Sequence, residues 1–253
     1  MIELRPSWLR DYLECPLRFR LRHRDRLGPK GLPASPGLSL GNSLHAALAA
    51  LHRVAQPAAM PAEALLRHHW QRVGYTSAQE EARYFALALH ALRRYQAEIV
   101  PPLGQVLGTE VYLARVVVSS GRRLGLAGRV DRITRLPDGT LEVLDYKAKA
   151  NGQLPAPTVL ARDLPTFLYY LLARVTYPAQ PRVVIAQLNL FTLDKVTVDY
   201  DPAELATNKA DLLSLADELE RHAFAERLGA HCAYCPVRSQ CPAYASEAQL
   251  SAL

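Results

Sequence analysis

Cysteine is scarce in this chain, which contains only four among 253 residues. The first five residues lack the charged-then-apolar pattern of a secretory leader, so we expect a cytoplasmic protein with reduced thiols. Long apolar runs are also missing, because the longest, residues 164–175, is interrupted by Pro165, Thr166 and Arg174. It is too short to cross a bilayer, so we expect no membrane-spanning segment. The sequence has no Gly-Lys-Ser/Thr phosphate-binding loop, which excludes a helicase of that type within the chain.

The four cysteines are unevenly placed: Cys15 stands alone near the start, whereas Cys232, Cys235 and Cys241 lie within ten residues near the end. Four soft ligands suit zinc or an iron–sulfur cluster. Disulfides would need an oxidising compartment, and unlinked cysteines are common in protein cores. The three clustered thiols lie in a loop-like segment with two prolines, which favours a shared metal over both alternatives. Zinc and an iron–sulfur cluster both remain open on spacing alone.

Positive charge exceeds negative charge by six, and 49% of the residues are hydrophobic. The composition therefore allows a substantial core and favours a polyanionic partner. Positive side chains gather between residues 10 and 26, next to Cys15. We expect Arg18 and Arg22 to follow a phosphate backbone there; the alternative is a solvated basic helix face. The basic residues of this segment are Arg10, Arg18, Arg20, Arg22, Arg24 and Arg26, with His23.

Periodicity and turn residues predict helices first and strands later. Ser7 is the expected N-cap of a helix carrying Trp8, Tyr12 and Cys15, and a Gly/Pro-rich break follows at residues 28–36. We expect one domain over residues 1–253, with a mainly helical region (1–103), a core (104–200) and a C-terminal helix with the cysteine segment (201–253). The expected helices are 39–54, 62–73, 77–99, 161–176 and 202–227, and the expected strands are 104–119, 122–135, 140–149, 183–190 and 196–200.

Charged residues on two of these strands form a candidate metal site. Asp145 and Lys147 are two apart and so point to the same face, and a hairpin could bring Asp131 beside them. Two close carboxylates repel unless a cation lies between them, and oxygen ligands suit Mg²⁺ or Mn²⁺. Lys147 could then orient the attacking water. The alternative is an exposed hairpin with a surface ion pair.

The pattern Gly128-x-x-Asp131 followed by Asp145-Tyr146-Lys147 resembles the core of the PD-(D/E)XK nuclease superfamily, in the form typical of its RecB-like branch. The expected order of strand, strand, strand, helix and strand is also similar to that of the family. The resemblance implies an α/β fold with a restriction-endonuclease-like core. In this fold a small mixed central sheet is flanked by helices.

Flanking motifs extend the resemblance over nearly the whole chain. Residues 7–19 resemble the family's segment Ser-x-Leu-x-x-Tyr-x-x-Cys-Pro-x-x-Phe, and residues 41–45 resemble its segment Gly-x-x-x-His, whose histidine, here His45, is a metal ligand. The terminal Cys-x₂-Cys-x₅-Cys spacing is similar to that of AddB-type nuclease domains and CRISPR-associated RecB-like exonucleases. In those proteins the three thiols join the early cysteine on a [4Fe-4S] cluster. The ligands implied here are Cys15, Cys232, Cys235 and Cys241.

The resemblance also implies roles in catalysis. His45, Asp131, Asp145 and the Tyr146 carbonyl would hold Mg²⁺ or Mn²⁺, Lys147 would position the water, and Tyr169 would contact nucleic acid. One segment departs from the pattern, because Pro165 stands where the family often has a glutamine before the tyrosine. This departure affects one substrate or water contact that the resemblance implies, and it removes no metal ligand.

The function implied is a metal-dependent DNase with an iron–sulfur cluster, an exonuclease acting on single-stranded DNA ends in repair, recombination or CRISPR adaptation. A helicase or another repair or CRISPR protein would be a partner in trans. The alternative is a DNA-binding or scaffold subunit that keeps the nuclease core only as structure. The presence of Asp131, Asp145 and Lys147 together favours the enzyme.

Overall fold

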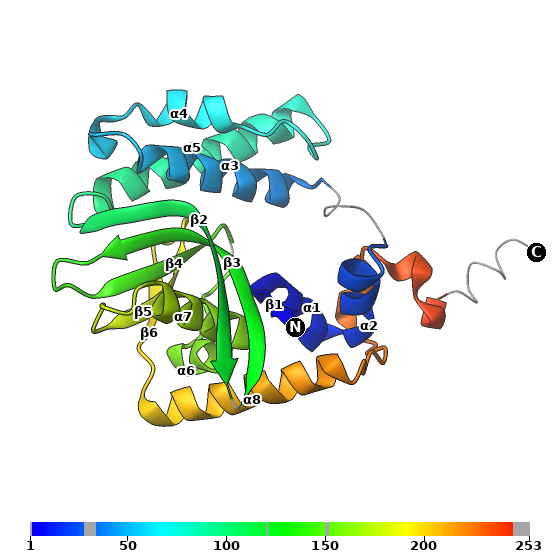
Figure 1. Cartoon of the computed structure of the whole chain (residues 1–253). Coiled ribbons are helices and arrows are strands. Elements are labelled where there is room, and N and C mark those ends of the chain that lie inside the picture. The colour runs from blue at the N-terminus through cyan, green and yellow to red at the C-terminus, as the bar shows by residue number, and fades with distance from the viewer. Residues whose placement is uncertain (1, 28–33, 120, 150–151, 245–253) are drawn as a thin grey trace, which may run out of the picture.

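Six strands form one mixed sheet at the centre of the computed structural model, which describes residues 2–27, 34–119, 121–149 and 152–244 (Figure 1). The strand order is β1-β3-β4-β5-β6, and β2 also pairs with β3. The β1–β3 and β4–β5 pairs are parallel, and the other pairs are antiparallel. The strands are β1 (Ile2–Leu4), β2 (Gln105–Ser119), β3 (Arg122–Arg135), β4 (Leu141–Lys147), β5 (Val183–Asn189) and β6 (Lys195–Val198).

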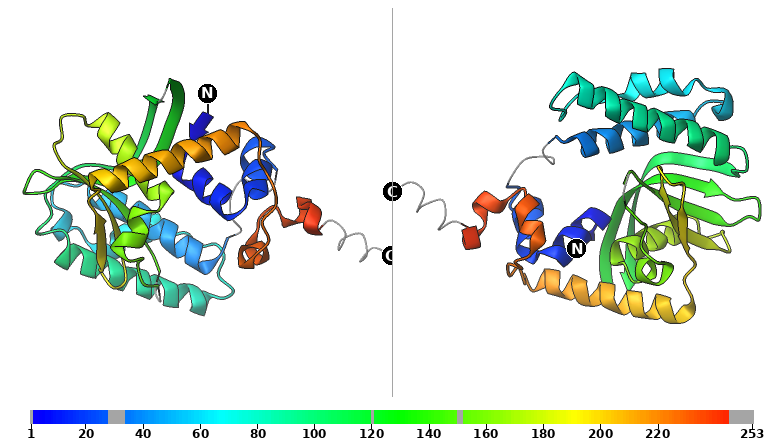
Figure 2. Two further views of the ribbon diagram at one scale, coloured as in Figure 1. Left: turned by 90° about the horizontal axis from the view of Figure 1, so that it is seen from below. Right: turned by 180° about the vertical axis from the view of Figure 1, so that it is seen from behind.

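Helices cover both faces of this sheet (Figures 1 and 2). One face carries α3 (Pro36–Leu51), α4 (Ala62–His69) and α5 (Ala78–Glu98). The other face carries α1 (Pro6–Glu14), α6 (Pro157–Ala161), α7 (Leu164–Thr176) and α8 (Pro202–Glu220). Short turns complete the described chain: α2 (Pro16–Phe19), a π-helical turn (Arg20–Arg24), and 3₁₀ turns at Pro57–Ala59, Ala230–Tyr234 and Arg238–Gln240. None of the helices in these ranges is both long and apolar enough to cross a membrane.

The central strands β4 and β5 are buried on both faces because each contributes to two cores. Val143 and Ile185 pack in the core beneath α7, whereas their neighbours Leu144 and Ala186 pack in the core beneath α3. Alternation of side chains across a strand produces this division. It explains why β5 is largely apolar, as expected for a parallel strand covered on both sides, whereas β4 also carries Glu142, Asp145 and Lys147.

The predicted α/β fold with a mixed central sheet flanked by helices is confirmed, but several local predictions are wrong. Helix α1 begins at Pro6 and its N-cap is Arg5, so Ser7 does not cap it. Neither β1 nor α6 is predicted from the sequence, and α8 ends at Glu220 instead of near residue 227. A three-residue strand such as β1 has too few residues for a periodic signal, since it is defined by pairing with β3. Residues 28–33 of the predicted break lie outside the described residues.

A buried ion pair links the strands below the helical layer. Arg132 and Glu142 have side chains 2% and 1% exposed, and Arg132 Nη2 donates to Glu142 Oε1 at 2.9 Å. Lys195 donates to the other oxygen of Glu142 at 2.8 Å. Arg132 Nη1 also donates to the hydroxyl of Tyr95, which lies 2.7 Å from the hydroxyl of Tyr146. The network holds β3, β4 and β6 to α5 directly behind the strands that carry Asp131 and Asp145.

We expect Arg132→Met to lower the free energy of unfolding by about 3–5 kcal/mol, because it leaves Glu142 without its buried partner. Chemical denaturation measures this change. The control is Arg123→Met, which alters an exposed arginine on the same strand and should change stability by less than about 0.5 kcal/mol. Equal, small effects from both substitutions would contradict the role given to the buried pair.

Candidate metal centre and cysteine pocket

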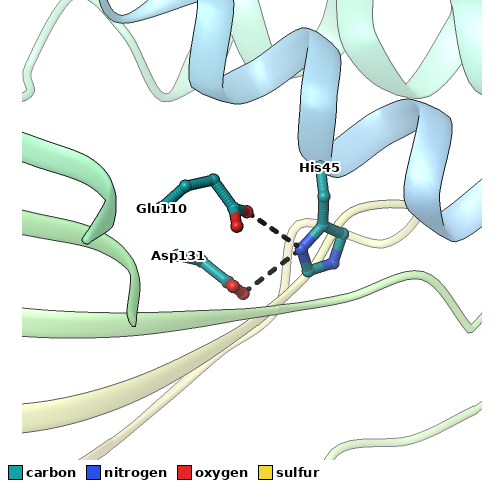
Figure 3. Close-up of side chains that lie close together, drawn as sticks. All are labelled: His45, Glu110 and Asp131. Atoms are coloured by element: carbon teal, nitrogen blue, oxygen red, sulfur yellow. Dashed lines mark ion pairs between the residues drawn. The ribbon is translucent and has the colours of Figure 1, made fainter. Parts of the chain in front are cut away.

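Three side chains from three elements converge above the sheet (Figure 3). His45 points down from α3, and its Nδ1 lies 3.5 Å from Asp131 Oδ2 and 3.9 Å from Glu110 Oε1. One ligand atom from each of these residues lies within 4.8 Å of the others. Carboxylate oxygens suit Mg²⁺ or Mn²⁺, and an imidazole nitrogen is a common ligand of divalent transition metals. The three residues therefore form a candidate metal site.

The β2–β3 hairpin positions the two carboxylates. Thr109 pairs with Arg132 and Val111 pairs with Val130, so Glu110 and Asp131 lie opposite one another. Glu110 has a φ of 51°, a left-handed conformation that costs an ordinary residue about 1–2 kcal/mol. Strain of this kind is often found at functional sites, where the surrounding structure maintains it. The backbone at Glu110 is therefore consistent with a functional carboxylate.

Charge is concentrated around His45. Burial alone would lower the pKa of His45, but hydrogen bonds to Asp131 and Glu110 and the charges of Asp131 and Asp145 raise this pKa to about 10. The imidazole is thus held in its protonated form, and its positive charge offsets the carboxylates. A divalent ion would supply that charge instead and would take the neutral imidazole as a ligand. The donor set fits such an ion.

Asp145 and Lys147 lie beside this group and contact one another. Lys147 Nζ is 2.5 Å from Asp145 Oδ2, and the two side chains are 22% and 26% exposed. Burial raises the pKa of Asp145, Lys147 opposes this shift, and the charge of Asp131 adds to it. Asp131 is fixed in turn, because its Oδ2 accepts a 2.7 Å hydrogen bond from the Tyr146 backbone amide. Since Asp145 is directed toward Lys147 in this structure, its role as a metal ligand stays a prediction.

Two tyrosines named by the sequence analysis border the site. The ring of Tyr146 is buried and meets the His45 ring edge-on, with centroids 5.7 Å apart. Tyr169, on α7, packs against Gly128, where an added Cβ would lie only 3.3 Å from the tyrosine ring. Burial raises the pKa of Tyr169, and the charges of Asp145 and Asp131 add to this shift. The metal contact of the Tyr146 carbonyl and the nucleic-acid contact of Tyr169 both stay predictions.

All four cysteines line one pocket, together with residues from both the N-terminal and the C-terminal parts of the described chain. Cys15 and Cys232 are buried, Cys235 and Cys241 are partly buried, and all four thiols are free. Burial raises the pKa of Cys235, and the neighbouring Cys15 and Cys232 add to this shift. A bound cation would offset this repulsion between thiolates. Four unlinked thiols around one pocket fit either of the four-thiolate groups predicted from the sequence.

Arg18 occupies a different environment from the one expected for a phosphate contact. Its side chain is only 9% exposed and pairs with Asp11 at 2.9 Å and with Glu14 at 2.5 Å. Arg22 pairs with the other oxygen of Asp11 at 2.6 Å and is 23% exposed. Arg18 also lines the cysteine pocket. The reason is that Asp11 of α1 pairs both with Arg18 of α2 and with Arg22 of the turn that follows, so Arg18 lies at the junction beside the thiols.

The Asp11 carboxylate is the centre of this junction. Burial alone would raise the pKa of Asp11, but the hydrogen bond with His23 and the charges of Arg18 and Arg22 hold it below its ordinary value. The hydrogen bond joins His23 Nε2 and Asp11 Oδ2 over 2.7 Å. Asp11 therefore stays ionised and ties α1 to the turn that follows α2.

The family model of the PD-(D/E)XK nuclease superfamily matches residues 3–242. The chain therefore belongs to this superfamily. Among solved structures it is similar to one titled as a putative exonuclease from Eubacterium rectale, with 13% identity, a TM-score of 0.50 and coverage of 88% of this chain and 79% of that one. This likeness supports the fold. Similarity to the crystal structure of SSO0001 covers 95% of this chain and 86% of that one at 15% identity, with a TM-score of 0.47. None of the curated proteins compared with the chain matches it significantly.

We expect Glu110→Gln to weaken Mn²⁺ binding by roughly tenfold or more, because it removes one negative charge from the candidate site. Isothermal titration calorimetry on the otherwise intact protein measures this affinity. Glu63→Gln is the matched control, since Glu63 lies in α4 and pairs with Arg67. If both variants bind Mn²⁺ as tightly as the wild type, Glu110 is not a ligand.

Proposed function

We propose that this protein is a Mg²⁺- or Mn²⁺-dependent deoxyribonuclease. The observation that supports the proposal best is the convergence of His45, Glu110 and Asp131 beside the paired Asp145 and Lys147. An ion held by these residues would supply Lewis-acid polarisation of a phosphoryl oxygen. Membership of the nuclease superfamily supports the reaction class, and the carboxylate donors support a divalent ion that prefers oxygen ligands.

Within the site the side chains have separate tasks. His45, Glu110 and Asp131 hold the ion, with Asp145 and the Tyr146 carbonyl as further ligands. Lys147 orients the attacking water, and its positive charge stabilises negative charge that develops on the phosphoryl group. With Asp145 acting as a ligand of a bound ion, the amine of Lys147 would be available for this task. Tyr169 closes the side of the site formed by α7.

We also propose that the four cysteines hold a [4Fe-4S] cluster, as in the RecB-like branch that the motifs resemble. The cluster would join the segment after α1 to the C-terminal segment and would contribute folding energy, much as a structural metal does. The gathering of all four unlinked thiols around one pocket supports this assignment. No redox step is required of it.

The substrate we propose is a single-stranded DNA end, processed in repair, recombination or CRISPR adaptation, with a helicase or another repair protein in trans. A direct test compares a linear single-stranded oligonucleotide with the same sequence closed into a circle. The linear form should be degraded progressively with Mg²⁺ or Mn²⁺ and the circle should persist. Equal cleavage of both forms would indicate an endonuclease, and binding without cleavage would indicate a scaffold subunit.

The basic segment provides a further prediction. If Arg22 contacts a phosphate, Arg22→Gln should lower the slope of log affinity against log salt by about 0.7 for single-stranded DNA. Fluorescence anisotropy in EDTA measures this slope without cleavage. Arg123→Gln, which removes an exposed arginine on β3, is the control. An unchanged slope for Arg22→Gln would identify Arg22 as an ion-pair residue of the junction alone.

A further inference from the structure

A polar cavity of about 540 Å³ opens beside the catalytic lysine. Its lining includes Lys147, Lys149 and Arg10 as well as the amide side chain of Gln187. The volume lies within the roughly 300–1,000 Å³ typical of sites for small organic ligands. The cavity is therefore large enough to receive part of a nucleotide next to the scissile bond.

Gln187 occupies this cavity from the sheet. It pairs in parallel register with Asp145, so the two side chains leave the sheet on the same face. The residue is only 7% exposed, yet its amide makes no hydrogen bond to any residue that the structure describes. The amide atoms of Gln187 are not among the fully buried polar atoms of the described residues, so solvent reaches them through the cavity. The remaining donor and acceptor capacity of this amide is directed to whatever enters the cavity.

The charges of the cavity favour an anion. Arg10 and Lys149 are exposed, and neither forms an ion pair within the described parts of the chain. Asp163 is the acidic residue of the lining, and its Oδ2 already accepts hydrogen bonds from the backbone amide and hydroxyl of Thr166. Within the described residues, two cations without an ion pair and the amide of Gln187 are thus available beside Lys147.

We propose that this cavity is a second phosphate subsite, which holds the phosphodiester next to the scissile one through Lys149, Arg10 and Gln187. The inference rests on the proposed nuclease function and deepens it. Binding of the adjacent linkage fixes the register of the strand, so that the scissile phosphate lies at Lys147 and the candidate ion site. The subsite therefore contributes to positioning the substrate and not to bond cleavage itself.

The test uses single-stranded oligonucleotides in which one neutral methylphosphonate replaces the phosphate on either side of the scissile linkage. With the wild type, one of these two positions should lower kcat/KM by about tenfold, the effect of losing one hydrogen bond to a charged group. Lys149→Gln and Gln187→Met should lower kcat/KM by a similar factor on the unmodified strand. On the strand with the neutral linkage, the kcat/KM of either variant should be no more than about twofold below that of the wild type, because the contact is already lost.

The control is Lys209→Gln, which removes the same charge from α8, where Lys209 lines a separate apolar groove. The subsite would be overturned if the effects of the substitution and of the neutral linkage on kcat/KM multiplied as independent losses. It would also be overturned if the variants cleaved the unmodified strand with the kcat/KM of the wild type. Since Lys149 is exposed, its variant keeps the test valid if Gln187→Met does not fold. A wild type that binds DNA in EDTA but never cleaves it would contradict the nuclease, and the same comparison of binding affinities would still decide the subsite. A wild type that does not bind DNA would contradict both the nuclease function and the phosphate subsite.

Discussion

Lys147→Ala should reduce cleavage by a factor of about 10²–10⁴ or more, while Mn²⁺ affinity stays close to that of the wild type. The amine is assigned to the attacking water and to developing charge, which are contributions of this size. It lies against Asp145 and not within the group formed by His45, Glu110 and Asp131. Single-turnover cleavage and calorimetric Mn²⁺ titration measure the two quantities separately.

Two further variants complete this comparison. Asp131→Ala should lose both cleavage and metal affinity, because Asp131 lies at the centre of the candidate site. Lys209→Ala should resemble the wild type in both measurements. Wild-type rates in Lys147→Ala would remove the lysine from the mechanism, and loss of metal affinity in that variant would reassign it to the ion site.

Cys15→Ser should be as damaging as Cys232→Ser, although more than 200 residues separate the two positions. Either substitution opens the proposed link between the segment after α1 and the C-terminal segment. Structural metal sites contribute on the order of 10 kcal/mol to folding, so we expect insoluble or protease-sensitive variants. Limited proteolysis and the yield of folded protein measure this effect.

The colour of the wild-type protein identifies the bound group. Anaerobic preparation should give a brown protein with about four irons per chain, as a cubane cluster on four thiolates implies. A colourless protein with stoichiometric zinc would contradict the cluster and keep the link between the ends. A stable, fully active Cys15→Ser variant would contradict the link itself.

The sheet could be predicted from the sequence because its central strands carry strong patterns. Apolar residues occupy most positions of β4 and β5, and the turn between β3 and β4 carries Pro137, Asp138 and Gly139. β1 could not be predicted in the same way, since its three residues become a strand only by pairing with Leu124–Leu126 of β3. The residues of β1 alone do not indicate that they pair with a strand more than 100 residues away.

The candidate site was only partly predictable for a similar reason. His45, Asp131 and Lys147 belong to recognisable motifs, whereas Glu110 belongs to none. A signal for Glu110 did exist, because the hairpin that pairs Ser119 with Arg122 also places residue 110 opposite residue 131. With this register, the predicted strands place the carboxylate of Glu110 opposite Asp131.

The environment of Arg18 shows a limit of reading charge from sequence alone. A run of basic residues near a helix suggested an open surface, but Asp11 and Glu14 on the preceding helix neutralise Arg18. Ion pairs of this kind depend on the path of the chain after Cys15, where α1 ends and α2 begins. The number of basic residues in a segment does not indicate whether their side chains point to solvent or pair with acidic residues of the protein.

Metal add-back to a single reaction tests the central claim most directly. An end-labelled single-stranded oligonucleotide is incubated with the protein in EDTA, and excess Mg²⁺ or Mn²⁺ is then added while products are followed by electrophoresis. We expect no cleavage before addition, cleavage after it, and none at any stage with Asp131→Ala. Cleavage in EDTA, or a wild type that binds the strand and leaves it intact with both ions, would contradict a metal-dependent nuclease centred on His45, Glu110 and Asp131.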